Sequence, residues 1–522
     1  MKKKFNVTGT CVSDMHYMVD ISNKLEKIKD LIDEKEYFTI NRARQYGKTT
    51  TLSQLRRFIS DEYTVILTSF EGLGDESFKD EATFCQTLLK NTHQALRFSD
   101  VSKEYQESWK NPEVTNFNLL SNHITDMCED KKIVLMIDEV DQASNHRMFL
   151  NFLGVLRKKF LASRDGLDFT FHSVILAGLY DIKNLKLKMV SEGTHTLSSD
   201  EKTYNTPWNI AVNFKVDLSF NPEEIAQMIE SYEQDHQTGM NSMEVAEEIH
   251  FYTKGYPVLV SGICHYIDVE LEKNWSKTGV KDAVQILVRE TDNSLFKGLS
   301  QNLEGKNEVY RLMYNILILG ERRSFSITNP AVDLAYRYAY IRDENGRMKV
   351  SNKVFEIVMT DYFISKDEGR TDVACSGGFI PEITRGNRFN MELCLERFMV
   401  HWQEIYNDKS EKFLEKECRM LFLMYLKPLL NGVGFYYIET ALSDDRRMDL
   451  VITYGTERFI LELKIWKGTL YNEEGAEQLK GYMDKFNEEK GYLLTFDFRK
   501  NPEKAEPNWR AVDGKKIFEV RV

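Results

Sequence analysis

Five short apolar runs alternate with helical patterns between Tyr37 and Phe220. The runs are YFTI, TVILTSF, IVLMIDE, SVILAGL and NFKVDLSF. Strands of a parallel sheet are covered by helices on both faces, so they appear as continuous apolar runs. We therefore expect an N-terminal segment over residues 1–35, followed by an α/β core with a parallel sheet over residues 36–220.

The next region has apolar residues at helical spacing. PEEIAQMIESY and MEVAEEIHFYTKGYPVLVSGICHYIDVEL predict amphipathic helices, which we interpret as a helical lid over residues 221–300. Short helices follow over residues 301–366 and end in YAYIRDENGRMKVSNKVFEIVM. There a strand, a turn at residues 344–346 and a second strand resemble the wing of a winged helix. We expect this region to be a winged-helix-like arm between modules.

Residues 367–390 hold glycine and charge without periodicity, which is typical of a linker. Residues 391–522 then predict a second, smaller α/β domain. Its expected helices are FLEKECRMLFLMYLKPLL and AEQLKGYMDKFNEEK, and its expected strands are GFYYIETAL, MDLVITY, FILELKI, GYLLTF and IFEVRV.

Composition places the chain among ordinary globular proteins, and 522 residues exceed what one core accommodates. The seven cysteines are scattered and form no CxxC pair, which argues against a disulfide framework or a zinc ribbon. The basic N-terminus has no apolar stretch behind it, and no apolar run approaches the roughly 18 to 20 residues of a membrane span. We therefore expect a cytoplasmic protein that does not contact a membrane.

The formal net charge of −12 limits how this chain can meet nucleic acid. Nonspecific affinity for nucleic acid comes from neutralising phosphates, and an acidic chain does this poorly. Any such contact must therefore be local, through a basic patch or through bound metal.

The sequence NRARQYGKTTT lies between the strand YFTI and the helix TLSQLRRFIS. A strand, a loop ending in GKT and a helix form the context of a Walker A loop, in which backbone N–H groups face the phosphates. After Gly47, Lys48 would reach the β- and γ-phosphates of ATP, and the Thr49 hydroxyl would bind Mg²⁺. Arg42 stands where the general consensus has its first glycine. The alternative is a helix capped by Thr49 beside a surface lysine.

The run KKIVLMIDEVDQ is an apolar strand that ends in Asp138 and Glu139, which is the Walker B pattern. Asp138 would hold Mg²⁺, and Glu139 would polarise the attacking water near the γ-phosphate. The alternative is a buried strand that meets solvent with two carboxylates. Because both halves of the pattern occur in order, a nucleotide site is the better interpretation.

On these motifs, residues 5–300 resemble the bacterial AAA-ATPase-like family, a relative of the STAND ATPases. The resemblance implies an arginine-rich P-loop that lacks the first glycine, and a sensor at the end of the fourth strand, over residues 173–181. It also implies a GxP turn that touches the nucleotide, matched by Gly255 and Pro257. The arginines of the loop would contact phosphate or pair with Asp138 or Asp141. The expected nucleotide-binding residues are Arg42, Arg44, Gly47, Lys48, Thr49, Thr50, Asp138, Gly255 and Pro257.

The sequence RRMDLVITYGTERFILELKIW predicts two strands joined by a turn. Glu462 and Lys464 are two residues apart in the second strand, so both side chains point to one face. A glutamate and a lysine that face inward are costly to bury without a task. Asp449 opens the first strand, and hairpin pairing would bring it to the same end of the sheet. Two carboxylates that bind Mg²⁺, together with a lysine that orients water, suit phosphodiester hydrolysis.

This arrangement resembles the core of the PD-(D/E)XK nucleases, whose fold is that of the restriction endonucleases. Gln478 and Tyr482 match the QxxxY that some branches carry on the next helix, where residues four apart share a face. Glu417 is the expected further acid, because it borders the apolar stripe of its helix, whereas Glu415 points more toward solvent. The alternative is a half-buried hairpin with a Glu–Lys ion pair. The AAA-ATPase-like family includes the same fusion of an ATPase region and a nuclease-like domain.

The expected function is therefore a P-loop ATPase with a Mg²⁺-dependent nuclease domain that acts on nucleic acid, with DNA favoured. ATP would gate cleavage, and a role in defence or in mobile-element biology fits this combination. The alternative is a nucleotide-dependent switch or scaffold whose nuclease-like domain only binds nucleic acid or protein. Assembly into a homo-oligomer is left open.

Overall fold

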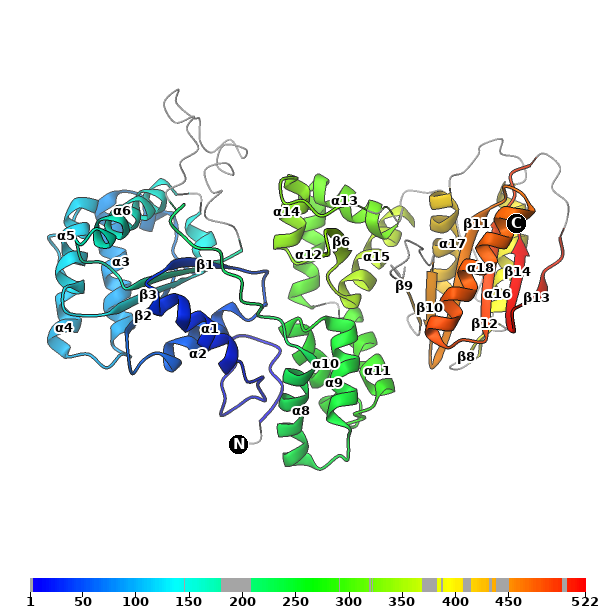
Figure 1. The fold of residues 1–522 in the computed structure, drawn as a ribbon, viewed down its shortest axis with the longest axis horizontal. Coiled ribbons are helices and arrows are strands. Elements are labelled where there is room, and N and C mark those ends of the chain that lie inside the picture. Colours follow the sequence, from blue (N-terminus) through cyan, green and yellow to red (C-terminus); the bar gives the residue numbers. More distant parts are fainter. Residues whose placement is uncertain are drawn as a thin grey trace, which may run out of the picture. The chain divides into compact units, whose positions relative to one another are not determined.

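The computed structural model describes residues 3–144, 146–179, 208–290, 292–318, 321, 323–368, 383–385, 388–406, 415–430, 434–437, 450–499 and 505–522 (Figure 1). The chain divides into two compact units. The first consists of Met1–His250, Gly255–His265 and Arg337–Ala339, and the second of Phe251–Lys254, Tyr266–Tyr336 and Tyr340–Val522. Over these described ranges, no helix is both long and apolar enough to cross a bilayer.

A four-stranded parallel sheet forms the centre of the first unit. Its order is β1 (Tyr37–Asn41), β4 (Ser173–Gly178), β3 (Ile133–Asp138) and β2 (Thr64–Ser69). Every residue of β3 and β4 is buried, as the continuous apolar runs predicted. The expectation of an α/β core on a parallel sheet is confirmed.

The predicted fifth strand, residues 213–220, is wrong. A single bridge joins Phe38 to Val212, and the residues after it form no strand. Side-chain contacts hold this extended segment beside β1 instead, because the Phe214 ring stacks on the Phe38 ring at 5.8 Å between centroids. The run therefore lies against the sheet through the Phe214 ring and does not join it as a strand.

Helices cover both faces of this sheet (Figure 1). One face packs against α3 (Glu81–Leu96), α5 (Phe117–Cys128) and α6 (Arg147–Arg164) in a large aromatic core. The other face carries α1 (Ser22–Asp33) and α2 (Lys48–Phe58). Shorter turns of helix lie at η1 (Asp75–Phe78), α4 (Lys103–Ser108) and η2 (Val140–Ala143).

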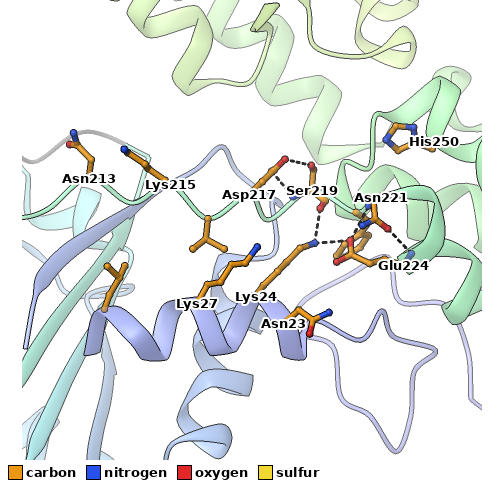
Figure 2. Close-up of a pocket in the computed structure, with 13 residues that line it drawn as sticks. Asn23, Lys24, Lys27, Asn213, Lys215, Asp217, Ser219, Asn221, Glu224 and His250 are labelled. Atoms are coloured by element: carbon orange, nitrogen blue, oxygen red, sulfur yellow. Dashed lines mark hydrogen bonds and ion pairs between the residues drawn. The ribbon is translucent and has the colours of Figure 1, made fainter. Parts of the chain in front are cut away.

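The expected lid, residues 221–300, begins with α8 (Pro222–His236), α9 (Ser242–Thr253) and α10 (Pro257–Val269). A capping box between Asn221 and Glu224 starts α8. Lys24 of α1 ties this start to the core, since its ammonium donates to the Ser219 carbonyl at 2.7 Å and to Glu224 at 2.8 Å. Figure 2 shows these bonds in a polar pocket between α1 and the segment that leads into α8.

The N-terminal segment also packs on α8. The rings of Phe5 and Tyr17 lie 5.3 Å from the Tyr232 ring, measured between centroids. The Tyr17 hydroxyl donates to Asp235 at 2.8 Å. The chain before α1 is therefore fastened to α8 by a small aromatic core and by the hydrogen bond from Tyr17 to Asp235.

The second unit begins with helices and a short hairpin. The helices are α11 (Lys277–Arg289), α12 (Ser294–Gly305), α13 (Asn307–Leu317), α14 (Pro330–Arg337) and α15 (Lys353–Glu368). The hairpin pairs β5 (Ile341–Glu344) with β6 (Arg347–Val350). Asn345 and Gly346 both have positive φ, as a two-residue type I′ turn requires. A strand, a turn and a strand thus lie where the sequence suggested a wing.

A six-stranded mixed sheet forms the rest of the second unit. Its order is β13 (Asn508–Val512), β14 (Lys515–Arg521), β12 (Lys490–Phe496), β11 (Glu457–Ile465), β10 (Leu450–Tyr454) and β9 (Gly434–Tyr437). Strands β9, β10 and β11 are antiparallel, whereas β11, β12 and β14 are parallel. Strand β13 was not predicted. The short pair β7 (Thr384–Arg385) and β8 (Arg388–Phe389), together with the end of α15, lies within the expected linker.

Helices cover both faces of this second sheet as well. On one face, α18 (Thr469–Phe486) places Leu479 and Met483 against Ile460 and Leu493. On the other face lie α16 (Met391–Tyr406) and α17 (Glu415–Leu430). Trp402 of α16 packs on the ring of Phe496 in β12. Residues of even number in β11 therefore face α18.

Gly255 ties the start of α10 to the segment before α8. Its φ is +72°, and an added Cβ would lie 1.9 Å from the Phe220 carbonyl oxygen. Gly239 has a similar φ of +79°, but an added Cβ there would meet open space.

We predict that Gly255→Ala destabilises the protein far more than Gly239→Ala. Both substitutions carry the left-handed penalty of about 1–2 kcal/mol, but only the first also displaces backbone. Thermal unfolding followed by circular dichroism checks this. Equal shifts of the melting temperature for the two variants would contradict the packing role of Gly255.

Candidate nucleotide and metal sites

The loop between β1 and α2 ends in a left-handed glycine. Gly47 has a φ of +81° and caps α2, whose first turn closes with the Thr51 N–H donating to the Gly47 carbonyl at 2.8 Å. An added Cβ at Gly47 would lie 3.8 Å from Pro257 of the lid. This conformation turns the N-terminus of α2, with its exposed N–H groups, toward a cavity.

Lys48 lies inside the curve of this loop. Its side chain is 6% exposed, and its ammonium donates to the carbonyls of Arg42 at 3.0 Å and Ala43 at 3.1 Å. Burial lowers the pKa of Lys48, while nearby carboxylates, Glu139 first among them, act in the opposite direction. The loop therefore holds a buried ammonium at the floor of the cavity.

Thr49 and Asp138 meet next to this lysine. The Thr49 hydroxyl donates to Asp138 Oδ2 at 2.6 Å, and Asp138 Oδ1 accepts the Glu139 N–H at 2.9 Å. Asp138 ends β3 and is 5% exposed. A hydroxyl and a carboxylate are oxygen ligands of the kind that Mg²⁺ prefers.

The described residues contain no group of three His, Cys, Asp or Glu side chains that could hold a metal ion. This does not argue against Mg²⁺ at Thr49 and Asp138. At nucleotide sites Mg²⁺ keeps several waters and takes few protein ligands besides the phosphates. The pair therefore fits the metal that the sequence predicted.

Glu139 follows Asp138 in a left-handed conformation with a φ of +52°. A non-glycine residue in this region is strained, and such residues concentrate at functional sites. Its side chain lines the cavity, and burial raises its pKa, although Lys48 acts to lower it. The backbone thus turns this carboxylate toward the same space as the Lys48 ammonium.

The cavity has a volume of about 610 Å³. The P-loop supplies one wall through residues 44–51, and the lid supplies another through Pro257, Val258 and Ser261. Residues 6–11 and 17–19 of the N-terminal segment complete it. Together with Glu139, stretches that are far apart in the sequence therefore enclose one space.

The N-terminal residues of this cavity were missed by sequence reasoning. The Cys11 N–H donates to the Thr50 hydroxyl at 3.3 Å, and the Ser261 hydroxyl of α10 donates to the Asn6 carbonyl at 2.6 Å. Most of these contacts use backbone atoms, which leave no residue-type signature. The glycine at position 9 was the available sequence signal, because glycine is typical of turns. In the structure Gly9 has a φ of +67°.

The lid contacts the P-loop through the predicted GxP turn. The Tyr256 hydroxyl donates to the Arg44 carbonyl at 2.5 Å, and its ring lies edge-on to the Tyr46 ring at 4.7 Å. Pro257 lines the cavity. Gly255 does not line it and packs on the Phe220 backbone instead.

Arg42 does not line the cavity. Its guanidinium donates to the carbonyls of Asn41 at 3.0 Å and Val216 at 2.9 Å. Among the described residues it forms no ion pair with Asp138 or Asp141, and its contact with phosphate stays a prediction. Asp141 accepts the Leu179 N–H just after β4, within the expected sensor segment, whose last two residues lie outside the described ranges. Arg42 therefore anchors the segment beside β1.

Glu462 and Lys464 of β11 form a buried ion pair in the second unit. The ammonium lies 2.9 Å from Glu462 Oε1, and the Glu462 side chain is 1% exposed. Both side chains face α18, where an added Cβ at Gly475 would lie 3.2 Å from Lys464 Cγ. The pair is held between the sheet and the start of that helix.

The other expected residues of this site are only partly described. Gln478 and Tyr482 both belong to α18. Tyr482 is buried in the core between this helix and the sheet, and Gln478 is half-buried. Asp449 lies outside the described residues, as does the side chain of Glu417. The structure therefore brings Glu462 and Lys464 together, and it leaves the full acidic set as a prediction.

Residues 17–277, half of the chain, match the family model described as an AAA-like domain. Similar solved structures include the Walker-type ATPase of Pyrococcus abyssi, with 12% identity and a TM-score of 0.47, over 68% of this chain and 99% of that one. The ORC2 protein of Aeropyrum pernix, in ADPNP–ADP complexes, has 11% identity and a TM-score of 0.36, over 67% and 96%. Cdc6p from Pyrobaculum aerophilum has 12% identity and a TM-score of 0.30, over 66% and 94%. A search of curated proteins gave no match.

We predict that Tyr256→Phe weakens ATP binding by about two- to tenfold, the net worth of one neutral hydrogen bond. Titration with a fluorescent ATP analogue measures the change. Tyr63→Phe is the matched control, because it removes a hydroxyl bonded to Asp33 at 2.6 Å away from the cavity. Equal affinities for the two variants would show that the lid contact does not contribute to binding.

Proposed function

We propose that this chain, which belongs to the AAA-like domain family, binds ATP with Mg²⁺ in the 610 Å³ cavity and hydrolyses it. The observation that carries this proposal is the 2.6 Å contact between Thr49 and Asp138 beside the buried Lys48 ammonium. Two separate motifs supply these residues, one from the start of α2 and one from the end of β3. A helix capped by Thr49 alone would not need the carboxylate.

Each side chain then has a separate task. The Lys48 ammonium would exchange its two loop carbonyls for phosphate oxygens, and the N-terminal N–H groups of α2 would bind further oxygens. Thr49 and Asp138 would hold Mg²⁺, which neutralises charge on the phosphates. Glu139 would accept a hydrogen bond from the attacking water and align it with the γ-phosphate.

We predict that Glu139→Gln keeps ATP binding and loses hydrolysis by roughly 100-fold or more. Only the carboxylate form orients water as an acceptor, and burial raises the pKa of Glu139 above its ordinary 4.5. In the wild type, kcat/KM for phosphate release should therefore fall as the pH drops through this raised pKa. Measuring release from pH 5 to pH 8 checks the profile.

Glu62→Gln serves as the control, since Glu62 pairs with Lys29 at the surface. It should retain both binding and turnover. If Glu139→Gln hydrolyses ATP at the wild-type rate, Glu139 has no part in the reaction.

For the second unit we propose a Mg²⁺-dependent nuclease. The buried Glu462–Lys464 pair supports this, since it lies at the junction of an antiparallel meander and a parallel crossover through α18. Leu450 of β10 pairs with Leu461, the neighbour of Glu462. Asp449 directly precedes Leu450 in the sequence. At that position it could supply a second carboxylate for the Mg²⁺ that Glu462 would bind.

In this proposal Glu462 and Asp449 hold the metal, which lowers the pKa of a bound water. Lys464 would release Glu462 and orient that water toward the scissile phosphate. ATP binding in the first unit would favour one conformation of the chain and so control cleavage. We propose this control of cleavage by ATP because the nucleotide site and the nuclease site belong to one chain.

We predict that Asp449→Asn and Glu462→Gln abolish Mg²⁺-dependent cleavage of plasmid and single-stranded DNA, because each removes a charge that holds the ion. Lys490→Gln, at the opposite end of the same sheet, should cleave normally. DNA binding without cleavage by the wild type would favour the alternative of a nucleotide-dependent scaffold. A Lys48→Ala variant with unchanged cleavage would remove the proposed control by ATP.

A further inference from the structure

Three polar side chains form a row across the second sheet. Lys464 of β11 is in register with Thr495 of β12, and Thr495 is in register with Arg521 of β14. Because these strands are parallel, residues in register project to the same face. Arg521 therefore lies on the face of Glu462 and Lys464, two strand spacings or about 10 Å away.

Arg521 is held in place by Trp466. Its guanidinium carbon lies 3.5 Å from the centroid of the Trp466 ring. Trp466 directly follows β11, two residues after Lys464. Its backbone N–H donates to the Phe496 carbonyl at 2.8 Å. The indole thus extends the row toward the carboxyl ends of the parallel strands, where open α/β sheets bind their ligands.

The guanidinium of Arg521 keeps its donors available. In the part of the chain that the structure describes, it makes neither a side-chain hydrogen bond nor an ion pair, although the Asp497 carboxylate lies close enough to interact with its charge. Arg499, over the same indole at 5.2 Å, differs, since it binds Asp497 through two nitrogens at 2.9 and 2.7 Å. Stacking uses the faces of a guanidinium and leaves its in-plane N–H groups for a planar oxyanion.

We propose that Arg521 binds a phosphate of the nucleic-acid strand that reaches Glu462 and Lys464. The inference rests on the nuclease proposed above and adds a substrate-positioning residue to it. In a chain of net charge −12, nucleic-acid affinity must come from a few placed cations. Arg521 is such a cation, because Trp466 fixes its orientation before the substrate arrives.

A purely structural role is the competing explanation. The stack on Trp466 would then only seal the end of the sheet, and its loss would lower stability without changing affinity for nucleic acid. The two explanations differ in the salt dependence of binding, since each phosphate contact contributes about 0.7–0.9 to the slope of log K against log salt. Stability alone does not separate them.

The experiment measures binding of fluorescein-labelled single-stranded and duplex DNA oligonucleotides to the full chain by anisotropy, with EDTA present so that no metal-dependent cleavage occurs. The variants are Arg521→Gln, Arg521→Lys and Arg458→Gln. Arg458 is the matched control, because its guanidinium stacks on Phe486 at 5.2 Å near the start of β11, at the opposite end of the sheet. A melting curve for each variant verifies folding.

We expect Arg521→Gln to weaken binding by about tenfold and to reduce the salt slope by nearly one, as loss of a charge-assisted phosphate contact requires. Arg521→Lys should keep the slope and lose part of the affinity, since an ammonium lacks the planar fork. Arg458→Gln should bind as the wild type does. Equal losses for Arg521→Gln and Arg458→Gln, or no DNA binding by the wild type, would overturn the inference.

The nuclease proposal fails separately. If the wild type binds DNA through Arg521 but does not cleave it with Mg²⁺, the phosphate contact stands and catalysis does not. If the wild type cleaves DNA and Arg521→Gln binds unchanged, catalysis stands and the phosphate contact does not.

Discussion

The direction of parallel strands is the constraint on which both candidate sites depend. Strands β3 and β4 are buried along their whole length, so charged groups of that sheet are placed where a strand ends. Asp138 occupies such an end, and α2 begins at the same edge after β1. In the second unit the parallel strands β11, β12 and β14 place Lys464 and Arg521 toward their carboxyl ends. In both sheets the polar side chains of the candidate sites thus lie toward the carboxyl ends of the parallel strands.

Around the nucleotide cavity, this rigid edge is completed by parts of the chain that do not belong to the sheet. Tyr256 joins the lid to the P-loop, and Cys11 joins the N-terminal segment to Thr50. The same N-terminal segment packs on the lid helix α8 through Phe5. A ligand that moves the P-loop would therefore act on the segment and on the lid together. This arrangement links occupancy of the cavity to the position of both.

The motifs were the most predictable part, because each is local. The chain itself places Gly47, Lys48 and Thr49 at a strand–helix junction, and apolar continuity marks the strand before Asp138. Contacts between distant segments were not predictable. Arg42 was expected to contact phosphate or to pair with Asp138 or Asp141, and its guanidinium donates to the Val216 carbonyl of the extended segment beside β1. The fifth apolar run likewise lies beside the sheet through ring stacking and forms no strand.

By itself, the sequence determined the parallel α/β core, the P-loop, the acidic end of β3 and the hairpin turn at Asn345, since backbone preference and side-chain period act over a few residues. The tertiary structure alone decided which groups share a space. It placed backbone atoms near Asn6 in the cavity and aligned Arg521 with Lys464 across three strands. Such proximity depends on strand register and on packing between remote segments, which no local pattern encodes.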